Sequence, residues 1–330
     1  MARTRILLVG AGAVGARAAR QLVESDEVGQ VVIVDTDDKR RRAVVASTGD
    51  KAKDGGGDGS TLRRVDAVLL ASPNGTHVDI AREHLARGRP VVSCADSIGD
   101  VQGLLDLGPE ARERGVAVVA GAGFSPGLTC LLARHAAADF DMVDEIHVAR
   151  SGTGGPACAR SHHGALKGTA LDWRDGGWQR RPAGSGRELC WFPDPIGAED
   201  CYRAKLPDAL LLVAAFPGVD RVTARLSATR RDRITARLPM LRKPHPEGLV
   251  GAVRVEVRGK RRGAQDVRVL GALDRPAVAA GSVAALAVRT LLRREVPAGA
   301  AGLGAVADPL PLLKELAAIG IKAAAFEGGR

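Results

Sequence analysis

Apolar residues follow two different spacings along this chain, and the change comes near residue 140. Before it, uninterrupted apolar runs at residues 6–9 and 31–34 are separated by a stretch in which Val14, Ala18 and Leu22 recur every fourth position. Unbroken apolar runs are typical of strands buried on both faces of a parallel sheet, and recurrence every third or fourth residue is typical of a helix. The first part of the chain therefore predicts alternating strands and helices around a parallel sheet.

The same pattern continues toward residue 120. Further buried strands are predicted at residues 66–71, 91–93 and 116–120, with helices at about 78–87 and 100–114. One strand of such a sheet is harder to locate, because residues 49–60 are rich in glycine and predict a flexible loop. Residues 43–47 are the best candidate for that strand.

Beyond residue 139, apolar and polar residues alternate. The alternation is clear at residues 146–148, 222–226, 253–257 and 267–269. A period of two is expected of strands buried on one face only, so a second, largely antiparallel sheet is predicted. The sequence Gly-Lys-Arg-Arg-Gly at residues 259–263 predicts a hairpin turn. The polar face is expected to be a solvated or dimer-forming surface that carries Arg221, Arg225, Arg254, Arg258 and Arg268.

Residues 151–202 lie between these strands and are rich in glycine and proline. They predict a long loop, and loops of such length in a compact domain are usually functional or disordered. This stretch holds most of the polar aromatic residues, together with the adjacent pair His162 and His163. Helices at residues 276–294 and 309–321 are expected to pack back on the first sheet.

Composition narrows the class of protein. A hydrophobic content of 45% and a charged content of 26% are those of a globular protein in water. No apolar run approaches the roughly 18 residues of a membrane span. The first predicted strand begins almost at Met1, which leaves no room for a signal peptide and favours the cytoplasm. Five scattered cysteines without a Cys-x-x-Cys pair predict free thiols and no metal site.

The net charge of +10 is compatible with an acidic ligand or with nucleic acid, and also with a compositional bias of the source genome. Nucleic acid is disfavoured as that ligand, because the arginines are spread along the chain without an aromatic stacking platform beside them. A dinucleotide together with a substrate that carries a carboxylate explains the positive net charge as well as nucleic acid does.

The first predicted strand runs directly into Gly10-Ala11-Gly12-Ala13-Val14-Gly15, a G-x-G-x-x-G turn that opens a helix. The first glycine of such a turn allows a tight bend, the second lets a pyrophosphate approach, and the third lets the helix pack closely on the strand. Asp35 follows the second strand, about 20 residues past the last glycine, where a carboxylate binds the ribose. Asp35 favours NAD, while the basic residues 39–42 leave NADP open.

Other residues that follow strands are expected at the carboxyl edge of the sheet, where ligands bind in open α/β folds. The predicted cofactor-binding residues are Gly10, Gly12, Ala13, Val14, Gly15, Asp35, Thr36, Ser72, Pro73, Asn74, His77, Cys94 and Ala95.

Residues 71–96, with the sequence ASPNGTHVDIAREHLARGRPVVSCAD, resemble the glucose–fructose oxidoreductase and inositol dehydrogenase family. Members of that family carry a similar T-P-N-x-x-H turn, a helix and a G-K-x-V-x-C strand. They have Glu-Lys-Pro after this strand, with a catalytic lysine, whereas Ala95-Asp96-Ser97 stands here. The resemblance implies an NAD(P)-dependent oxidoreductase acting on a polyol or sugar.

Residues 121–128, with the sequence GAGFSPGL, and the closing stretch 305–328 are similar instead to saccharopine dehydrogenase (saccharopine reductase) and its relatives. This second resemblance implies an amino-acid or opine-like secondary amine as substrate, with the 124–127 turn over the nicotinamide. From the residues themselves, Ser125 is expected to cap a helix and Pro126 to take its first position.

The candidate proton donors are Asp96, His163 and His162. The position of Asp96 after a strand favours it, whereas a histidine has a pKa near neutrality without help. The predicted substrate-binding residues are Ser97, Phe124, Ser125 and Gly127. Two alternatives stay open: a methyltransferase, which also has an acid after its second strand, and a binding module that senses NAD(P) without turnover.

The predicted fold is α/β: a Rossmann dinucleotide-binding domain plus a second α+β domain with a largely antiparallel sheet. We expect the first domain to span residues 1–124, the substrate or oligomerisation domain 125–286, and C-terminal helices at 287–330 to return to the first domain. A homodimer is expected.

Overall fold

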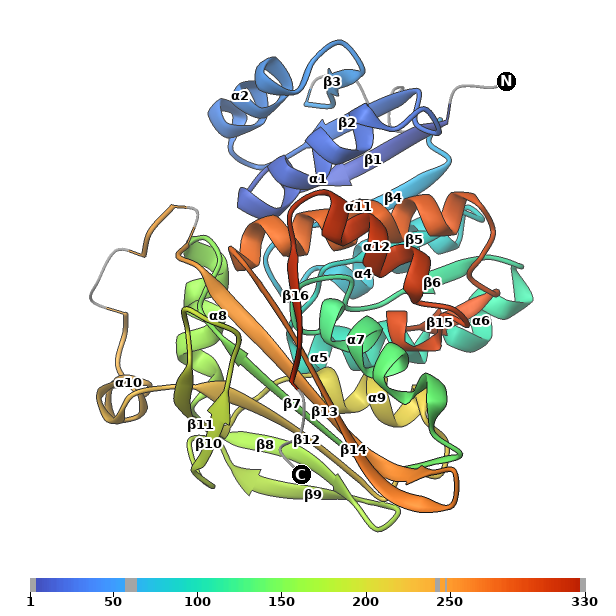
Figure 1. The fold of residues 1–330 in the computed structure, drawn as a ribbon. Coiled ribbons are helices and arrows are strands. Elements are labelled where there is room, and N and C mark those ends of the chain that lie inside the picture. The colour runs from blue at the N-terminus through green and yellow to red at the C-terminus, as the bar shows by residue number, and fades with distance from the viewer. Residues whose placement is uncertain (1–3, 57–63, 241–243, 247, 327–330) are drawn as a thin grey trace. The chain divides into compact units, whose positions relative to one another are not determined.

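The computed structural model describes residues 4–56, 64–240, 244–246 and 248–326 (Figure 1). Residues 57–60 of the predicted glycine-rich loop and residues 327–328 of the closing stretch lie outside this part. The chain forms two compact units: unit 1 consists of Met1–Gly123 with Ala277–Leu303, and unit 2 of Phe124–Pro276 with Gly304–Arg330. Thus the chain returns to unit 1 at residue 277, earlier than the sequence suggested. The segment from residue 304 onward lies with unit 2.

Unit 1 contains a seven-stranded sheet in the order β15-β6-β5-β4-β1-β2-β3, whose neighbouring strands pair in parallel. Ile6, Leu8 and Val32 in its centre are fully buried, as the unbroken apolar runs predict. The strands are β1 (Arg5–Val9), β2 (Gln30–Val34), β3 (Ala52–Asp54), β4 (Ala67–Leu70), β5 (Val91–Ser93), β6 (Ala117–Val119) and β15 (Gly299–Ala301).

Apart from α6, which follows α5 directly, the helices of this unit begin after strands. They are α1 (Ala13–Glu24), α2 (Asp38–Thr48), α4 (His77–Leu85), α5 (Ile98–Asp106), α6 (Gly108–Glu113) and α11 (Pro276–Leu292). Helix α11 crosses α1 closely, because a Cβ atom on Gly281 would lie 2.6 Å from the Val14 carbonyl oxygen. Glu27 accepts hydrogen bonds from Arg289 and Arg293 and so holds the far end of α11.

Two predictions for unit 1 are wrong. Residues 43–47 are helical, because α2 buries Arg41, Val44 and Thr48 at helical spacing. The missing strand is β3, inside the stretch that was expected to be a flexible loop. The helix predicted at 100–114 is divided into α5 and α6. Pro109 explains the division, since proline has no N–H to continue the hydrogen-bond ladder of a helix.

Unit 2 contains a nine-stranded sheet with the main order β10-β11-β12-β7-β13-β14-β16, to which β8 and β9 attach at β12. Its pairs are antiparallel except β7 with β12, which are parallel, so the prediction of a largely antiparallel sheet is confirmed. The strands are β7 (Met142–Ser151), β8 (Thr169–Arg174), β9 (Gly177–Pro182), β10 (Glu188–Trp191), β11 (Ala198–Arg203), β12 (Arg221–Ser227), β13 (Gly251–Arg261), β14 (Ala264–Asp274) and β16 (Lys322–Phe326).

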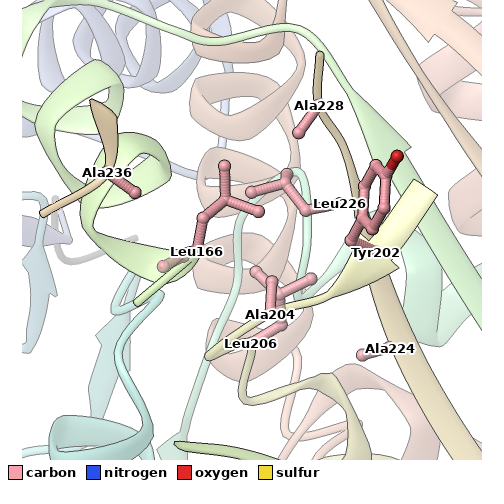
Figure 2. Packing of buried hydrophobic residues seen from close by; sticks show 9 residues of the cluster. Leu166, Tyr202, Ala204, Leu206, Ala224, Leu226, Ala228 and Ala236 are labelled. Atoms are coloured by element: carbon pink, nitrogen blue, oxygen red, sulfur yellow. The ribbon is translucent and has the colours of Figure 1, made fainter. Parts of the chain in front are cut away.

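The helices of unit 2 are α7 (Leu128–Ala136), α8 (Pro156–Ala165), α9 (Asp208–Ala215), α10 (Arg230–Thr235) and α12 (Leu310–Ala318). One buried cluster joins the end of α8 to the sheet, as Figure 2 shows. In it Leu166 faces Leu226 of β12 and Leu206, with Tyr202 of β11 beside them. Arg233 of α10 stacks on the Tyr202 ring, with its guanidinium carbon 4.2 Å from the ring centroid.

The stretch 151–202 is not a loop. It folds into α8 and the strands β8 to β11. Two of its tryptophans, Trp173 and Trp178, form an edge-to-face pair across the β8–β9 hairpin with centroids 5.0 Å apart, which is a structural contact. High glycine and proline content therefore marked tight turns between short strands.

Two local predictions for unit 2 also need correction. Helix α7 begins at Leu128 with Gly127 before it, so Ser125 does not cap it and Pro126 does not occupy its first turn. Arg268 lies opposite Val257 in the β13–β14 pair and therefore shares the helix-covered face, where it pairs with Asp139 at 3.0 Å. The other four arginines do share one face, and Arg254 and Arg258 are paired with Glu256 there.

Candidate functional site

The three glycines of the G-x-G-x-x-G turn are each required for a different structural reason. A Cβ atom on Gly10, whose φ is +105°, would lie 2.5 Å from the Ala71 carbonyl oxygen, and one on Gly15 would lie 1.9 Å from the Gly10 carbonyl oxygen. These two positions therefore exclude any side chain. A Cβ on Gly12 would meet no described atom within 4 Å. Open space at Gly12 is what the approach of a ligand requires.

Helix α1 presents its N-terminus to the same space. Gly12 precedes its first residue, Ala13, and within the described residues no side chain caps this end. The first turn consists of Ala13, Val14, Gly15 and Ala16, so it carries no charge that would repel an anion. Unbonded N–H groups and the helix dipole make such an end suitable for a pyrophosphate.

Asp35 directly follows β2 and lies beside this turn. Its Oδ2 atom accepts a hydrogen bond of 2.6 Å from the Ala11 N–H, and its Oδ1 atom accepts one of 2.8 Å from the Asp37 N–H. These bonds fix the carboxylate, and each oxygen keeps a second lone pair for a ribose hydroxyl. Asp35 therefore fits the predicted ribose-binding role. Thr36 follows it in the turn into α2.

The basic residues after Asp35 have separate positions. Arg41 is buried and bonds Asp54 at 2.6 Å, with a further contact to Asp38, so it stabilises the β2–β3 side of the sheet. Arg40 is half exposed and lies 3.7 Å from Asp35 and 2.9 Å from Asp37. Of these two arginines, Arg40 is the one placed to meet a 2′-phosphate.

His77 joins the carboxyl ends of β4 and β5. Its Nε2 atom lies 2.8 Å from the Ser72 carbonyl oxygen and its Nδ1 atom 2.8 Å from Ser93 Oγ. A carbonyl can only accept, so Nε2 carries the proton and Nδ1 accepts from the Ser93 hydroxyl. Burial lowers the pKa of His77, and the ring stays neutral. Both ring nitrogens are engaged by the protein, so His77 acts by positioning the Ser72 turn.

Asn74 and Asp96 tie the two following loops together. The Asn74 amide donates to Asp96 Oδ1 at 2.6 Å, and the Asp96 N–H donates to Asn74 Oδ1 at 3.3 Å. Ser97 caps α5 by accepting from the Asp100 N–H at 3.1 Å, so Asp96 is not the cap. Asp100 also accepts from the Gly75 N–H at 2.7 Å. The result is a fixed Asp96 carboxylate at the carboxyl edge.

The remaining predicted cofactor residues, Pro73, Cys94 and Ala95, lie in these same two loops. Burial and then the charge of Asp96 raise the pKa of Cys94 to about 12. Cys94 is therefore a protonated thiol near neutral pH, which rules out a thiolate at this place.

Unit 2 contains a buried polar cluster that sequence reasoning missed. Asp208, at the start of α9, accepts hydrogen bonds from Thr129 Oγ1 at 2.6 Å and from Ser125 Oγ at 3.0 Å. Arg150 at the end of β7 donates to the Ser125 carbonyl oxygen at 3.1 Å. Burial raises the pKa of Asp208, although the Thr129 bond, Arg150 and the Ser125 bond oppose it. In the sequence, the one sign of this cluster is an acidic residue directly after Pro207, at the start of an apolar helix.

His162 and His163 lie on α8 in different environments. Burial, and next the charge of Arg150, lower the pKa of His162 to about 3. Its Nδ1 atom is buried and has no hydrogen-bond partner among the residues that the structure describes. The expectation that the pKa of this histidine lies near neutrality is therefore wrong for His162. His163 is more accessible, and its Nε2 atom lies 3.0 Å from the Leu238 carbonyl oxygen.

The predicted substrate residues belong to both units. Ser97 ends the β5–α5 loop of unit 1, whereas Phe124, Ser125 and Gly127 form the first turn of unit 2. Ser125 is fixed by Asp208 and Arg150, and Gly127 has a φ of +123° directly before α7. Their contact with a substrate stays a prediction.

Comparison with known proteins identifies the first part of the chain. Residues 4–121 match the model of an oxidoreductase family with an NAD-binding Rossmann fold, the group of glucose–fructose oxidoreductase, inositol dehydrogenase and MocA. These residues are therefore similar to the NAD-binding Rossmann domain of that oxidoreductase family. The domain therefore binds NAD(P), which confirms the predicted cofactor.

The rhizopine catabolism protein MocA of Rhizobium meliloti is 37% identical over 92 residues. That match covers 28% of this chain and 29% of the relative, so the chain spans less than a third of the length of that protein. Sequence likeness to this relative is thus confined to one stretch.

Solved structures extend the likeness to both units. Saccharopine dehydrogenase (L-Glu forming) from Saccharomyces cerevisiae aligns with a TM-score of 0.71 at 16% identity, over 98% of this chain and all of that one. GenD2 from gentamicin A biosynthesis, solved in complex with NAD, aligns with a TM-score of 0.51 at 17% identity, over 99% of this chain and 97% of that one. At these identities the likeness shows the fold, which confirms the predicted fold class. No helix of the described residues is both long and apolar enough to cross a membrane.

Proposed function

We propose that this protein is an NAD(P)-dependent dehydrogenase or reductase that acts on the C–N bond of an amino-acid or opine-like amine or imine. The observation that carries the proposal is the open space at Gly12, faced by the uncapped N-terminus of α1 and bordered by the fixed carboxylate of Asp35. These groups suit a pyrophosphate and a ribose, and a bound nicotinamide supplies hydride chemistry.

Two observations support an amine or imine as the substrate. The whole-chain fold is like that of a saccharopine dehydrogenase. In addition, the catalytic lysine of the polyol-oxidising family has no counterpart at Ala95-Asp96-Ser97. The substrate carboxylate would meet the N–H groups at the start of α7, where Asp208 and Arg150 fix the preceding turn.

In the proposed mechanism, the chain contributes binding, orientation and one proton. The first turn of α1 holds the pyrophosphate and Asp35 accepts from the ribose. Asp96, fixed by Asn74, or His163 on α8 moves the proton to or from the substrate nitrogen. His162 stays neutral because of its low pKa, so it serves as a positioning group. We further propose a cytoplasmic homodimer.

The proposal is tested with a panel of candidate substrates: amino acids combined with keto acids, opines, and polyols. Turnover of each is followed by the change in NADH absorbance. Turnover of an amine or imine is expected. Asp96→Asn or His163→Ala should lower turnover about 100-fold or more if the residue donates the proton. Asp79→Asn on the exposed side of α4 is the matched control, with unchanged turnover.

Three other outcomes would overturn parts of the proposal. Oxidation of polyols alone would assign the chain to the inositol dehydrogenase type of activity. Stabilisation by NAD(H) without turnover of any compound would favour the binding module. Near-normal turnover in both variants would exclude Asp96 and His163 as proton donors.

A further inference from the structure

Unit 2 contains an apolar pocket, whose lining shares Leu128, the first residue of α7, with the candidate site. Its volume is about 310 Å³, which lies in the range of about 300–1,000 Å³ that is usual for small-molecule sites. Helices α7 and α12 form two walls, and the sheet surface of β14 and β16 forms the floor. Its large apolar side chains are those of Leu128, Leu132, Leu270, Leu310, Leu313, Leu316 and Ile321.

The pocket exists because the sheet is built from small residues at this point. Gly271 and Ala272 of β14 and residues 323–325 of β16, all alanine, line the floor beneath α12. Leu270 and Ala272 share the helix-covered face of β14, whereas a Cβ atom on Gly271 would point to the other face, 2.8 Å from Pro193 and 3.0 Å from Phe326. The neighbouring helices therefore face a gap that the local sequence does not fill.

The charges at the pocket have one sign. Among its described lining residues the ionisable ones are Lys314 of α12 and His135 of α7, and none is acidic. Lys314 is exposed and can turn toward a ligand. His135 stands at the carboxyl end of α7, where the helix dipole disfavours an anion, so Lys314 is the main electrostatic partner.

We propose that this pocket binds a small apolar carboxylate of the fatty-acid class, with its hydrocarbon chain between α7 and α12 and its carboxylate at Lys314. The apolar walls account for the chain and the unopposed cation for the carboxylate. Leu128 and Leu132 lie on α7 together with Thr129. A ligand that fixes the position of α7 therefore also stabilises the Thr129–Asp208 hydrogen bond.

The test is calorimetric titration of the full-length protein with decanoate and with decanol, below their aggregation concentrations. Decanoate is expected to bind with a stoichiometry of one per chain, and decanol about fivefold more weakly, which is the size of one exposed ion pair. Ala317→Trp fills the pocket and should abolish binding of both. Lys314→Gln should weaken decanoate about fivefold and leave decanol unchanged.

Two matched controls separate these effects from general ones. Ala318→Trp adds the same side chain at the next position of α12, outside the pocket lining, and Lys260→Gln removes one lysine charge on β13. Both should bind decanoate like the parent protein. No binding of decanoate by the parent protein, or equal binding of decanoate and decanol, would overturn the proposal. A dimer in solution that only Ala317→Trp dissociates would assign the pocket to a second copy of the chain.

Discussion

Gly12 and Gly15 belong to one turn, yet substitutions at the two positions should impair different properties of the protein. Gly15 faces the backbone of Gly10, so any side chain there disturbs the fold. Gly12 faces open space, so a side chain there occupies the place of the ligand and leaves the fold intact. Stability and cofactor binding can therefore be separated by residue.

For these glycines we expect Gly12→Val to keep the melting temperature of the free protein but to lose the upward shift caused by NAD(H). Gly15→Ala should lower the free energy of unfolding by about 2 kcal/mol or more, because its Cβ overlaps a carbonyl oxygen. Gly99→Ala in α5 is the control, since its Cβ meets no described atom within 4 Å; it should stabilise by about 0.5 kcal/mol. Thermal unfolding with and without NAD(H) measures all three, and a normal shift in Gly12→Val would contradict the assignment.

The low pKa of His162 predicts how the free energy of unfolding changes in acid. Its pKa is about 3 in the fold and near 6.5 in the unfolded chain, so the unfolded chain binds more protons between these values. The stability it contributes is present above pH 6.5 and is lost as the pH falls toward 3. At pH 5 the loss is about 2 kcal/mol. Urea unfolding at pH 5 and pH 7.5 should show this loss in the parent protein and a smaller one in His162→Leu; equal losses would refute it.

At the scale of elements, the carboxyl ends of β4 and β5 are fixed to each other as well as to their own helices. Three contacts span the two loops: His77 with Ser93, Gly75 with Asp100, and Asn74 with Asp96. The loops that would meet the nicotinamide therefore move together.

This cross-linking predicts coupling between Asn74 and Asp96. Asn74→Ala and Asp96→Ala should each weaken NADH binding, and the double variant should lose little more than the worse single one. The coupling energy should be about 1.5–3 kcal/mol, the size of a hydrogen bond to a charged group. Fluorescence titration of the four proteins with NADH gives this energy. Additive losses would show that the two side chains act independently.

Asp208 fixes the first turns of α7 and α9 to each other and gives a second prediction about pH. Its pKa is raised in the fold, so the stability it contributes is present below its unfolded pKa and is lost as the pH rises through the folded pKa. Asp208→Asn keeps an acceptor for Thr129 and has no charge. Its free energy of unfolding relative to the parent should therefore rise from pH 4 to pH 7, as urea unfolding can measure, with Asp220→Asn as the control. A constant difference would contradict the raised pKa.

Much of the first unit was predictable from sequence, because its signals are local. The run at 6–9, the glycine turn and Asp35 each depend on near neighbours, and β1, α1 and β2 follow them. The Asp208 cluster was not predictable, since its partners Ser125 and Arg150 stand far away in the chain. Turns rich in glycine hid the strands of 151–202, because short strands with few apolar residues resemble loops. The His162 environment also depends on tertiary burial.

At the scale of the whole molecule, several arginines are engaged in internal ion pairs. On the polar face of the unit 2 sheet, Arg225 binds Glu188 at 2.6 Å, and Glu256 binds both Arg254 and Arg258. These arginines are therefore a weak guide to a ligand, whereas the net charge of +10 is the excess of basic residues that such pairs leave. Arg225 and Glu256 are buried, so removing one partner of these pairs would leave a buried charge uncompensated and should cost about 3–5 kcal/mol.

The return of the chain to unit 1 has a consequence for recombination between related genes. The cofactor-binding unit is encoded in two separate pieces, and the second supplies β15 at the sheet edge and α11 against α1. A single crossover near codon 123 would combine the sheet of one parent with the edge strand and helix of the other. Functional chimeras should therefore need two exchanges, or a circular permutation that makes both pieces contiguous.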